Sequence, residues 1–221
     1  MKFELTILGS SSATPIFQRN PTAQILNINE KIIMIDCGEG TQQQMLRFGI
    51  KFNKIDSIFI SHLHGDHFFG LVGLLSSMNL NGRVKALNLY CPVALKEILD
   101  IQFLHSGSVL RFPLNYFFTQ TTSPQKIVDT PDYIVETIIL NHRIPCTGFL
   151  FTTKKAFLTH KKAFFYFEVY FCLFFLLPNT QYRKFYPSVF GASIFIFVRK
   201  DRDFRAKTFY LYSVHFYPHL Y

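Results

Sequence analysis

The chain has 221 residues, of which 49% are hydrophobic, and a net charge of +9. This length suits a single domain. The four cysteines lack the paired spacing of a disulfide framework, which favours a reducing compartment. The chain starts in an apolar stretch without a charged-then-apolar signal segment, so we expect a cytoplasmic protein.

Charge and aromatic residues are distributed unevenly along the chain. Residues 1–151 carry twelve Lys and Arg against eleven Asp and Glu, whereas residues 152–221 carry eleven against three. The second stretch also holds 14 of the 27 phenylalanines and eight of the eleven tyrosines. The net positive charge is therefore no evidence for an RNA-binding surface in the first stretch. We divide the chain into an N-terminal half, 1–151, and an atypical aromatic and basic tail, 152–221.

Strand and helix patterns alternate along the N-terminal half. The helix near Gly38 should end at Gly49, a normal C-terminal stop. Residues 123–132, bounded by prolines, are predicted to form a surface loop. The predicted strands cover 3–8, 23–28, 32–36, 57–61, 86–90, 114–118, 134–140 and 147–151, and the predicted helices cover 39–48, 67–79 and 92–105.

Four side chains that can bind metal follow the predicted strand over 57–61. His62 and His64 alternate along an extended segment, so both can face one metal ion, while Asp66 and His67 lie beyond the turn and can face a second. Imidazole and carboxylate groups bind zinc well, and bound zinc activates water for hydrolysis. The alternative is a polar loop with incidental histidines. Because each zinc needs at least three protein ligands, residues distant in sequence must complete the site.

His142 is the best candidate for such a distant ligand. It follows the apolar, β-branched run 134–140 and therefore also lies at a strand end. His105, near the end of a predicted helix, has no such context and is interpreted as structural.

Several segments, in order along the chain, resemble the ribonuclease Z family of the metallo-β-lactamase superfamily. The segment from Asp36 to Gln42, with the sequence DCGEGTQ, resembles a motif that is specific to this family. The family members cut the 3′ trailer from precursor tRNA, and the resemblance covers residues 1–151. The other matching segments are Leu8 to Ser10 with Pro15, Arg19 to Pro21, His62 to Leu71 and Asn141 to Phe149.

The resemblance implies an αββα sandwich, incomplete in its C-terminal half, and a two-zinc site. By position, His62, His64 and His142 would hold one zinc ion. Asp66 and His67 would hold the other, and Asp66 is also the candidate general base.

Three further positions carry roles from the same resemblance. Asp36 would support the histidine loop, although it could instead cap the helix near Glu39. Arg19 and Asn20 would contact the substrate, although Arg19 could be a solvated loop charge. 

The resemblance ends near Phe151. The family has a later aspartate that bridges both metals and a final histidine, and neither has a counterpart in its expected context. The resemblance therefore implies two zinc ions per subunit in the family, with one or fewer as an alternative for this chain. We interpret the tail as the product of out-of-frame translation. The tail residues that could substitute as ligands are His160, His215, His219, Asp201 and Asp203.

These observations predict a zinc-dependent endoribonuclease that removes the 3′ trailer from precursor tRNA, with activity impaired by the altered second half. Family members are usually homodimers. No membrane association is expected, because the apolar run 163–177 is shorter than the roughly 20 residues that cross a bilayer. Two alternatives stay open: another hydrolase of the superfamily that acts on a small phosphodiester, and a non-catalytic remnant that binds metal weakly.

Overall fold

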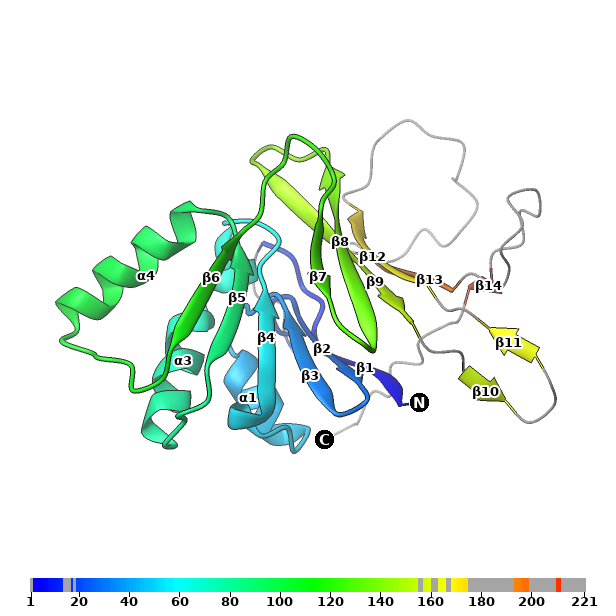
Figure 1. Cartoon of the computed structure of the whole chain (residues 1–221). Coiled ribbons are helices and arrows are strands. Elements are labelled where there is room, and N and C mark those ends of the chain that lie inside the picture. The colour runs from blue at the N-terminus through cyan, green and yellow to red at the C-terminus, as the bar shows by residue number, and fades with distance from the viewer. Residues whose placement is uncertain are drawn as a thin grey trace.

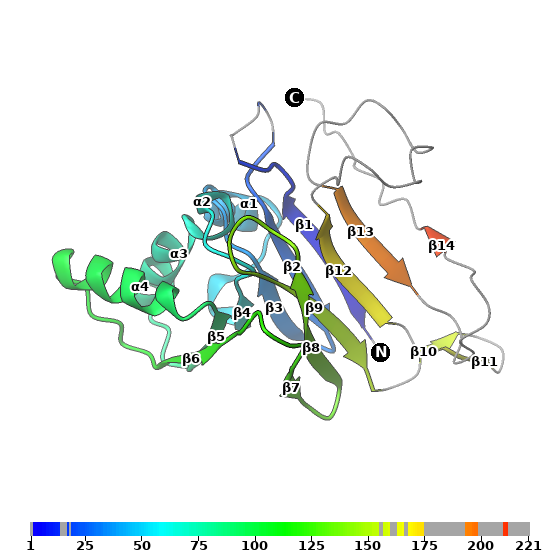
Figure 2. The ribbon, with the colours of Figure 1, turned by 90° about the horizontal axis from the view of Figure 1, so that it is seen from above.

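The computed structural model describes residues 2–13, 17 and 19–154, together with the backbone of five strands beyond them. Two six-stranded sheets form the framework. Figures 1 and 2 show them from two directions, with the helices beside one sheet.

The first sheet has its strands in chain order. Strands β1, β2 and β3 pair antiparallel, and the pairs β3–β4, β4–β5 and β5–β6 are parallel. Parallel strands that are covered on both faces are typically continuously apolar, as in Ile32 to Ile35. The strands are β1 (Phe3–Gly9), β2 (Ala23–Ile28), β3 (Lys31–Ile35), β4 (Ile55–Phe59), β5 (Leu87–Cys91) and β6 (Leu114–Phe118).

The second sheet is antiparallel, with the order β14-β13-β12-β9-β8-β7. Its longest hairpin contact, between β8 and β9, pairs in register from Tyr133 opposite Thr153 to Leu140 opposite Cys146. Strand β12 then pairs with β9, so the backbone of the tail extends this sheet. The strands are β7 (Lys126–Asp129), β8 (Tyr133–Leu140), β9 (Cys146–Thr153), β12 (Glu168–Phe174), β13 (Ser193–Val198) and β14 (Tyr210–Leu211); β10 (Phe157–Thr159) and β11 (Ala163–Phe165) form a separate hairpin.

The two sheets are joined by an apolar layer centred on Phe59. Its ring stacks on Tyr90 of the same sheet, with centroids 4.4 Å apart. It also meets the edges of Phe149 and Phe151 of the second sheet, at 5.1 and 5.4 Å. All four rings are buried, so this layer fixes the second sheet against the first.

The described helices pack on the other face of the first sheet. Met45, Leu74 and Leu95 form one buried cluster with Met34 and Leu89 of the strands. The described part is thus a helix–sheet–sheet sandwich of the expected α/β class, and a helical layer over the second sheet is not among the described residues. The helices are α1 (Thr41–Arg47), the 3₁₀ turn η1 (Phe52–Lys54), α2 (Gly65–Phe68), α3 (Leu71–Leu80) and α4 (Ala94–His105).

Two local predictions were wrong. The predicted loop 123–132 contains strand β7, which pairs with β8. The predicted helix 67–79 is instead two helices, α2 and α3, with a break at Phe69 and Gly70. At the break a Cβ on Gly70 would lie 2.1 Å from the carbonyl oxygen of Gly38, so only glycine allows this close approach of the two segments.

No helix among the described residues has the length and apolar character needed to span a bilayer. The division at residue 151 remains a prediction.

Candidate metal centre

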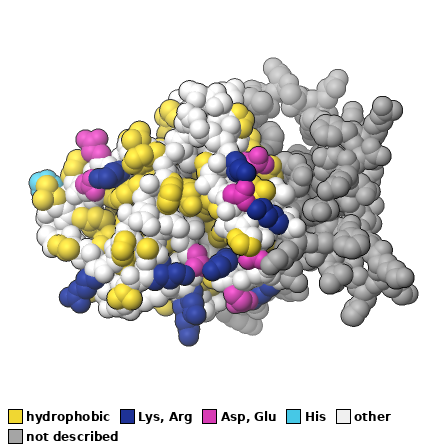
Figure 3. Space-filling view, viewed as in Figure 1, with side chains coloured by type: hydrophobic (Ala, Val, Ile, Leu, Met, Phe, Trp, Pro, Cys, Tyr) yellow, Lys and Arg dark blue, Asp and Glu magenta, His cyan; other side chains and the backbone are white. Residues whose placement is uncertain are grey.

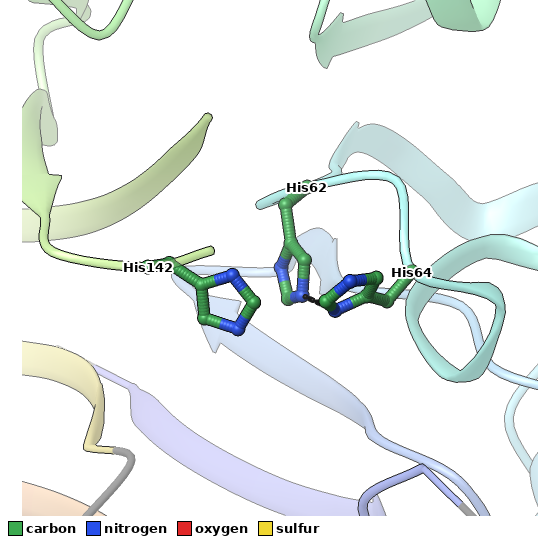
Figure 4. Close-up of side chains that lie close together, drawn as sticks. All are labelled: His62, His64 and His142. Atoms are coloured by element: carbon green, nitrogen blue, oxygen red, sulfur yellow. Dashed lines mark hydrogen bonds between the residues drawn. The ribbon is translucent and has the colours of Figure 1, made fainter. Parts of the chain in front are cut away.

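Three histidines from two separate loops converge where the two sheets meet. His62 and His64 follow β4, and His142 follows β8. One ligand nitrogen from each lies within 4.8 Å of the other two, and Nε2 of His62 lies 3.1 Å from Nδ1 of His64 (Figure 4). His62 is completely buried, and the other two are half-buried. The predicted convergence of these three imidazoles is confirmed.

A backbone hydrogen bond ties the two loops together beside this cluster. The amide of Thr147, at the start of β9, donates to the carbonyl oxygen of Ser61 at 3.0 Å. The amide of Ile60 donates to the carbonyl oxygen of Tyr90, so the segment before His62 is held at the end of the first sheet. The cluster therefore depends on both sheets.

Asp36, directly after β3, anchors the loop that carries His62, His64 and His67. Its Oδ1 accepts hydrogen bonds from the amide and the hydroxyl of Ser61, both at 2.9 Å. Its Oδ2 accepts one from Nδ1 of His67 at 2.8 Å. The carboxylate is fully buried, and its backbone has a left-handed φ of 55°. The alternative that Asp36 caps the helix was wrong, because α1 begins after Gly40 without a side-chain cap.

Ser61 also sets the orientation of His62. Its hydroxyl hydrogen is donated to Asp36, so its oxygen accepts from Nδ1 of His62, 3.0 Å away. The thiol sulfur of Cys146 lies 3.6 Å from the same nitrogen. With the proton at Nδ1, the Nε2 lone pair of His62 faces the other two imidazoles and can bind a metal ion.

Asp66 and His67 lie beside this cluster. The rings of His62 and His67 have centroids 3.9 Å apart, and Nε2 of His67 is 3.5 Å from Oδ2 of Asp66. In the part of the chain that the structure describes, this buried Nε2 makes no hydrogen bond. A buried polar nitrogen without a hydrogen bond is rare in proteins and fits a metal ligand. Oδ2 of Asp66 accepts a hydrogen bond from the amide of Ala13 at 2.8 Å.

The histidines differ in their affinity for protons. Burial, together with the positive charge of His67, lowers the pKa of His62 to about 3. Burial and the neighbouring His64 also lower the pKa of His142. At His67 burial acts in the same direction, but the Asp36 carboxylate outweighs it and raises the pKa of the ring. His62 and His142 are therefore neutral at pH 7, the form in which imidazole binds metal.

The loop between β1 and β2 carries the predicted substrate contacts. Arg19 is exposed there. Asn20 is half-buried, its carbonyl oxygen accepts from the amide of Ser11 at 3.0 Å, and its side-chain oxygen lies beside Gly40 at the start of α1. Asn20 thus packs the loop against α1, whereas Arg19 extends into solvent.

The remaining predicted residues lie elsewhere. His105 ends α4 and is exposed, apart from the cluster. The tail candidates His160, His215, His219, Asp201 and Asp203 are outside the described residues.

Three contacts of the cluster were missed from the sequence. They are made by Ser61, Cys146 and Arg143, whose Nη2 lies 3.3 Å from Nε2 of His64. Ser61 and Arg143 each adjoin a predicted ligand in sequence, and that adjacency was the available signal.

On the face shown in Figure 3, the charged side chains do not form a patch of one sign. Lys and Arg side chains are interspersed there with Asp and Glu. This agrees with the near-neutral composition of residues 1–151.

Two sheets with helices on the outer face of the first, and histidines converging at the ends of β4 and β8, define a metallo-β-lactamase fold with a site suited to a divalent metal ion. Comparison with known proteins agrees. The family model described as "Anti-Pycsar protein Apyc1" matches residues 3–168, so the chain belongs to that family.

Curated relatives confirm the resemblance to ribonuclease Z. Proteins of that name from Cytophaga hutchinsonii and Bacteroides thetaiotaomicron are 53% and 45% identical over 154 residues, which is 70% of this chain and 49% of each relative. The chain thus spans about half the length of the curated relatives it matches.

Solved structures show the same fold. The short form of human tRNase Z aligns with a TM-score of 0.61 and 30% identity, over 68% of this chain and 65% of that chain. The metallo-β-lactamase fold protein YhfI from Bacillus subtilis aligns with a TM-score of 0.52 and 19% identity, over 67% and 57%.

Proposed function

We propose that the cluster belongs to a zinc-dependent endoribonuclease that removes the 3′ trailer from precursor tRNA. The observation that carries the proposal is the convergence of three imidazoles from two loops, with His62 neutral and its Nε2 directed at the cluster. Imidazole donors suit zinc, although they also accept other transition metals. When bound, zinc would supply an activated water and a Lewis acid for the phosphodiester.

The residues of the chain would divide the work as follows. His62, His64 and His142 would hold one zinc ion. His67, through Nε2, and Asp66 would hold the second. Asp36 would keep His67 and the segment around Ser61 in place through its buried hydrogen bonds.

Asp66 is the proposed general base. The Ala13 amide fixes its Oδ2, and the carboxylate is 8% exposed beside His67. We assign Oδ1 as the atom that accepts the proton from the attacking water. The leaving group is the 3′ oxygen of the tRNA, which takes up a proton and becomes a 3′-hydroxyl, and the trailer keeps the phosphate at its 5′ end.

The test uses the zinc-loaded full chain and a precursor tRNA with a labelled 3′ trailer. Release of the trailer, absent in His64→Ala, supports the proposal. A rate below that of a full-length relative is expected, because the bridging aspartate and final histidine lack counterparts among the described residues. Equal product with wild type and His64→Ala refutes it.

A second candidate is another hydrolase of the superfamily that acts on a small phosphodiester, because the same cluster of three histidines could serve it. Turnover of a small chromogenic phosphodiester without cleavage of precursor tRNA would favour it.

A third candidate is a non-catalytic remnant. Among the described residues, the compact group of possible metal ligands contains three histidines only. Two zinc ions per chain would favour an enzyme, and one or none the remnant. We also propose, from the resemblance alone, that the protein is a cytoplasmic homodimer. A measurement of its molecular mass in solution tests the dimer.

A further inference from the structure

Arg143 lies at the solvent side of the histidine cluster. It follows His142 in the loop between β8 and β9, and its side chain is exposed. Its Nη2 lies 3.3 Å from Nε2 of His64. The guanidinium group is therefore next to the position where a substrate would reach the cluster.

The charge of Arg143 is not neutralised by a carboxylate. Among the described residues, each ion pair joins a lysine or a histidine to an acid, and none includes Arg143. A guanidinium stays protonated at any physiological pH. Placed beside a divalent cation it would be repelled, unless an anion lies between the two charges. The position of Arg143 thus fits an anionic ligand of the cluster.

Direct contacts link the guanidinium to the imidazoles. Nη2 of Arg143 lies 3.3 Å from Nε2 of His64, and Nδ1 of His64 lies 3.1 Å from Nε2 of His62. A guanidinium has five N–H donors, so the contact with His64 leaves others for an anionic ligand.

We infer that Arg143 binds the phosphate group of the substrate beside the loaded metal centre. A guanidinium matches two oxygens of a phosphate with parallel hydrogen bonds. Arg19, the arginine expected for this role, lies on a different loop and could contact the RNA elsewhere. The inference rests on the proposed function only in that the substrate contains a phosphodiester.

The experiment measures binding of inorganic phosphate to the full chain, with and without zinc, by titration calorimetry. Zinc content is measured on the same samples. Arg143→Ala and Arg143→Gln should each weaken phosphate binding about tenfold or more at unchanged zinc content, since a charge-assisted pair is lost. Arg143→Gln removes the charge and keeps a polar side chain with N–H donors, so its loss of phosphate binding reports on the charge. Arg143→Lys should lose less, because the charge remains. Arg47→Ala, an exposed arginine in the last turn of α1, is the matched control and should bind phosphate as wild type does.

Three results overturn the inference: phosphate binding by Arg143→Ala equal to wild type, a loss of zinc in proportion to the loss of phosphate binding, or no phosphate binding by the zinc-loaded wild type. Failure to cleave precursor tRNA, with phosphate binding that still depends on Arg143, refutes the proposed nuclease and supports this inference. The two proposals therefore fail separately.

Discussion

Nδ1 of His67 donates a hydrogen bond to Oδ2 of Asp36 at 2.8 Å, and both side chains are completely buried. This pair joins the end of β3 to the helix that follows the histidine loop. It also determines which nitrogen of His67 faces the cluster.

The Asp36→Ala variant should be strongly destabilised, because it leaves His67 and Ser61 without their buried acceptor. Breaking a buried charged pair costs about 3–5 kcal/mol. Urea unfolding of the metal-free protein measures the change. Asp36→Asn is the matched control, since asparagine tolerates the left-handed backbone and keeps an acceptor oxygen; it should lose clearly less. Equal stability of wild type and Asp36→Ala would contradict the anchoring role.

The His64→Ala variant should lose zinc and nuclease activity together. His64 contributes one nitrogen to a group of three, and zinc sites with two protein ligands are weak. Zinc per chain, measured by atomic emission, is compared with His105→Ala, which removes an exposed histidine at the end of α4. If both variants lose the same zinc, the assignment of the cluster is wrong.

Lowering the pH should release zinc from the two positions in a fixed order. The pKa of His67 is raised, so protons compete for its Nε2 already near neutral pH. The pKa of His62 is lowered to about 3, so protons compete there only in acid. Zinc at Asp66 and His67 should therefore leave first, at the higher pH. Zinc content of wild type and His67→Asn, followed through the same pH series, checks this; a wild-type curve that matches the variant at every pH would exclude a second ion.

The Asp66→Asn variant should lower the cleavage rate more than it lowers zinc content. Removing a general base costs about a hundredfold or more in rate. Zinc content and single-turnover cleavage of precursor tRNA, measured on one preparation, give the comparison. Parallel losses would make Asp66 chiefly a metal ligand.

The Arg19→Ala variant should weaken binding of precursor tRNA and leave zinc content unchanged, because Arg19 is exposed on the loop after β1. A filter-binding titration at one fixed salt concentration measures the affinity. Arg111→Ala, another exposed arginine, serves as the comparison; equal effects of the two substitutions would indicate only general charge attraction.

The sequence predicted the elements whose causes are local. Strands such as 134–140 are rich in β-branched residues, and the helix that follows Gly40 ends at Arg47, shortly before Gly49 with its left-handed φ. It did not predict strand β7, because its four residues are defined by pairing with β8. The break at Gly70 was missed for a similar reason: it follows from contact with the Gly38 backbone, far away in sequence.

In the candidate site, too, the local features were predicted and the contacts between distant segments were not. His62, His64 and His142 were found because each lies at the end of a recognisable strand. The contact between Arg143 and His64 joins loops 79 positions apart, and its only sequence signal is that Arg143 follows the predicted ligand His142. Likewise, the sequence left two roles open for Asp36. The start of α1 at Gly40 without a side-chain cap excluded helix capping, and the hydrogen bonds to Ser61 and His67 showed the anchoring role.

The hydrogen bond from the amide of Thr147 to the carbonyl oxygen of Ser61 joins the two sheets beside the three imidazoles. A metal ion held by His62, His64 and His142 would therefore span two layers of the sandwich. Binding free energy at such a site adds to the free energy of docking one layer on the other. Zinc affinity then depends on how tightly the hairpin of β8 and β9 packs on the first sheet. A smaller side chain in place of Phe149, in the apolar layer between the sheets, would therefore weaken zinc binding although Phe149 is not a ligand.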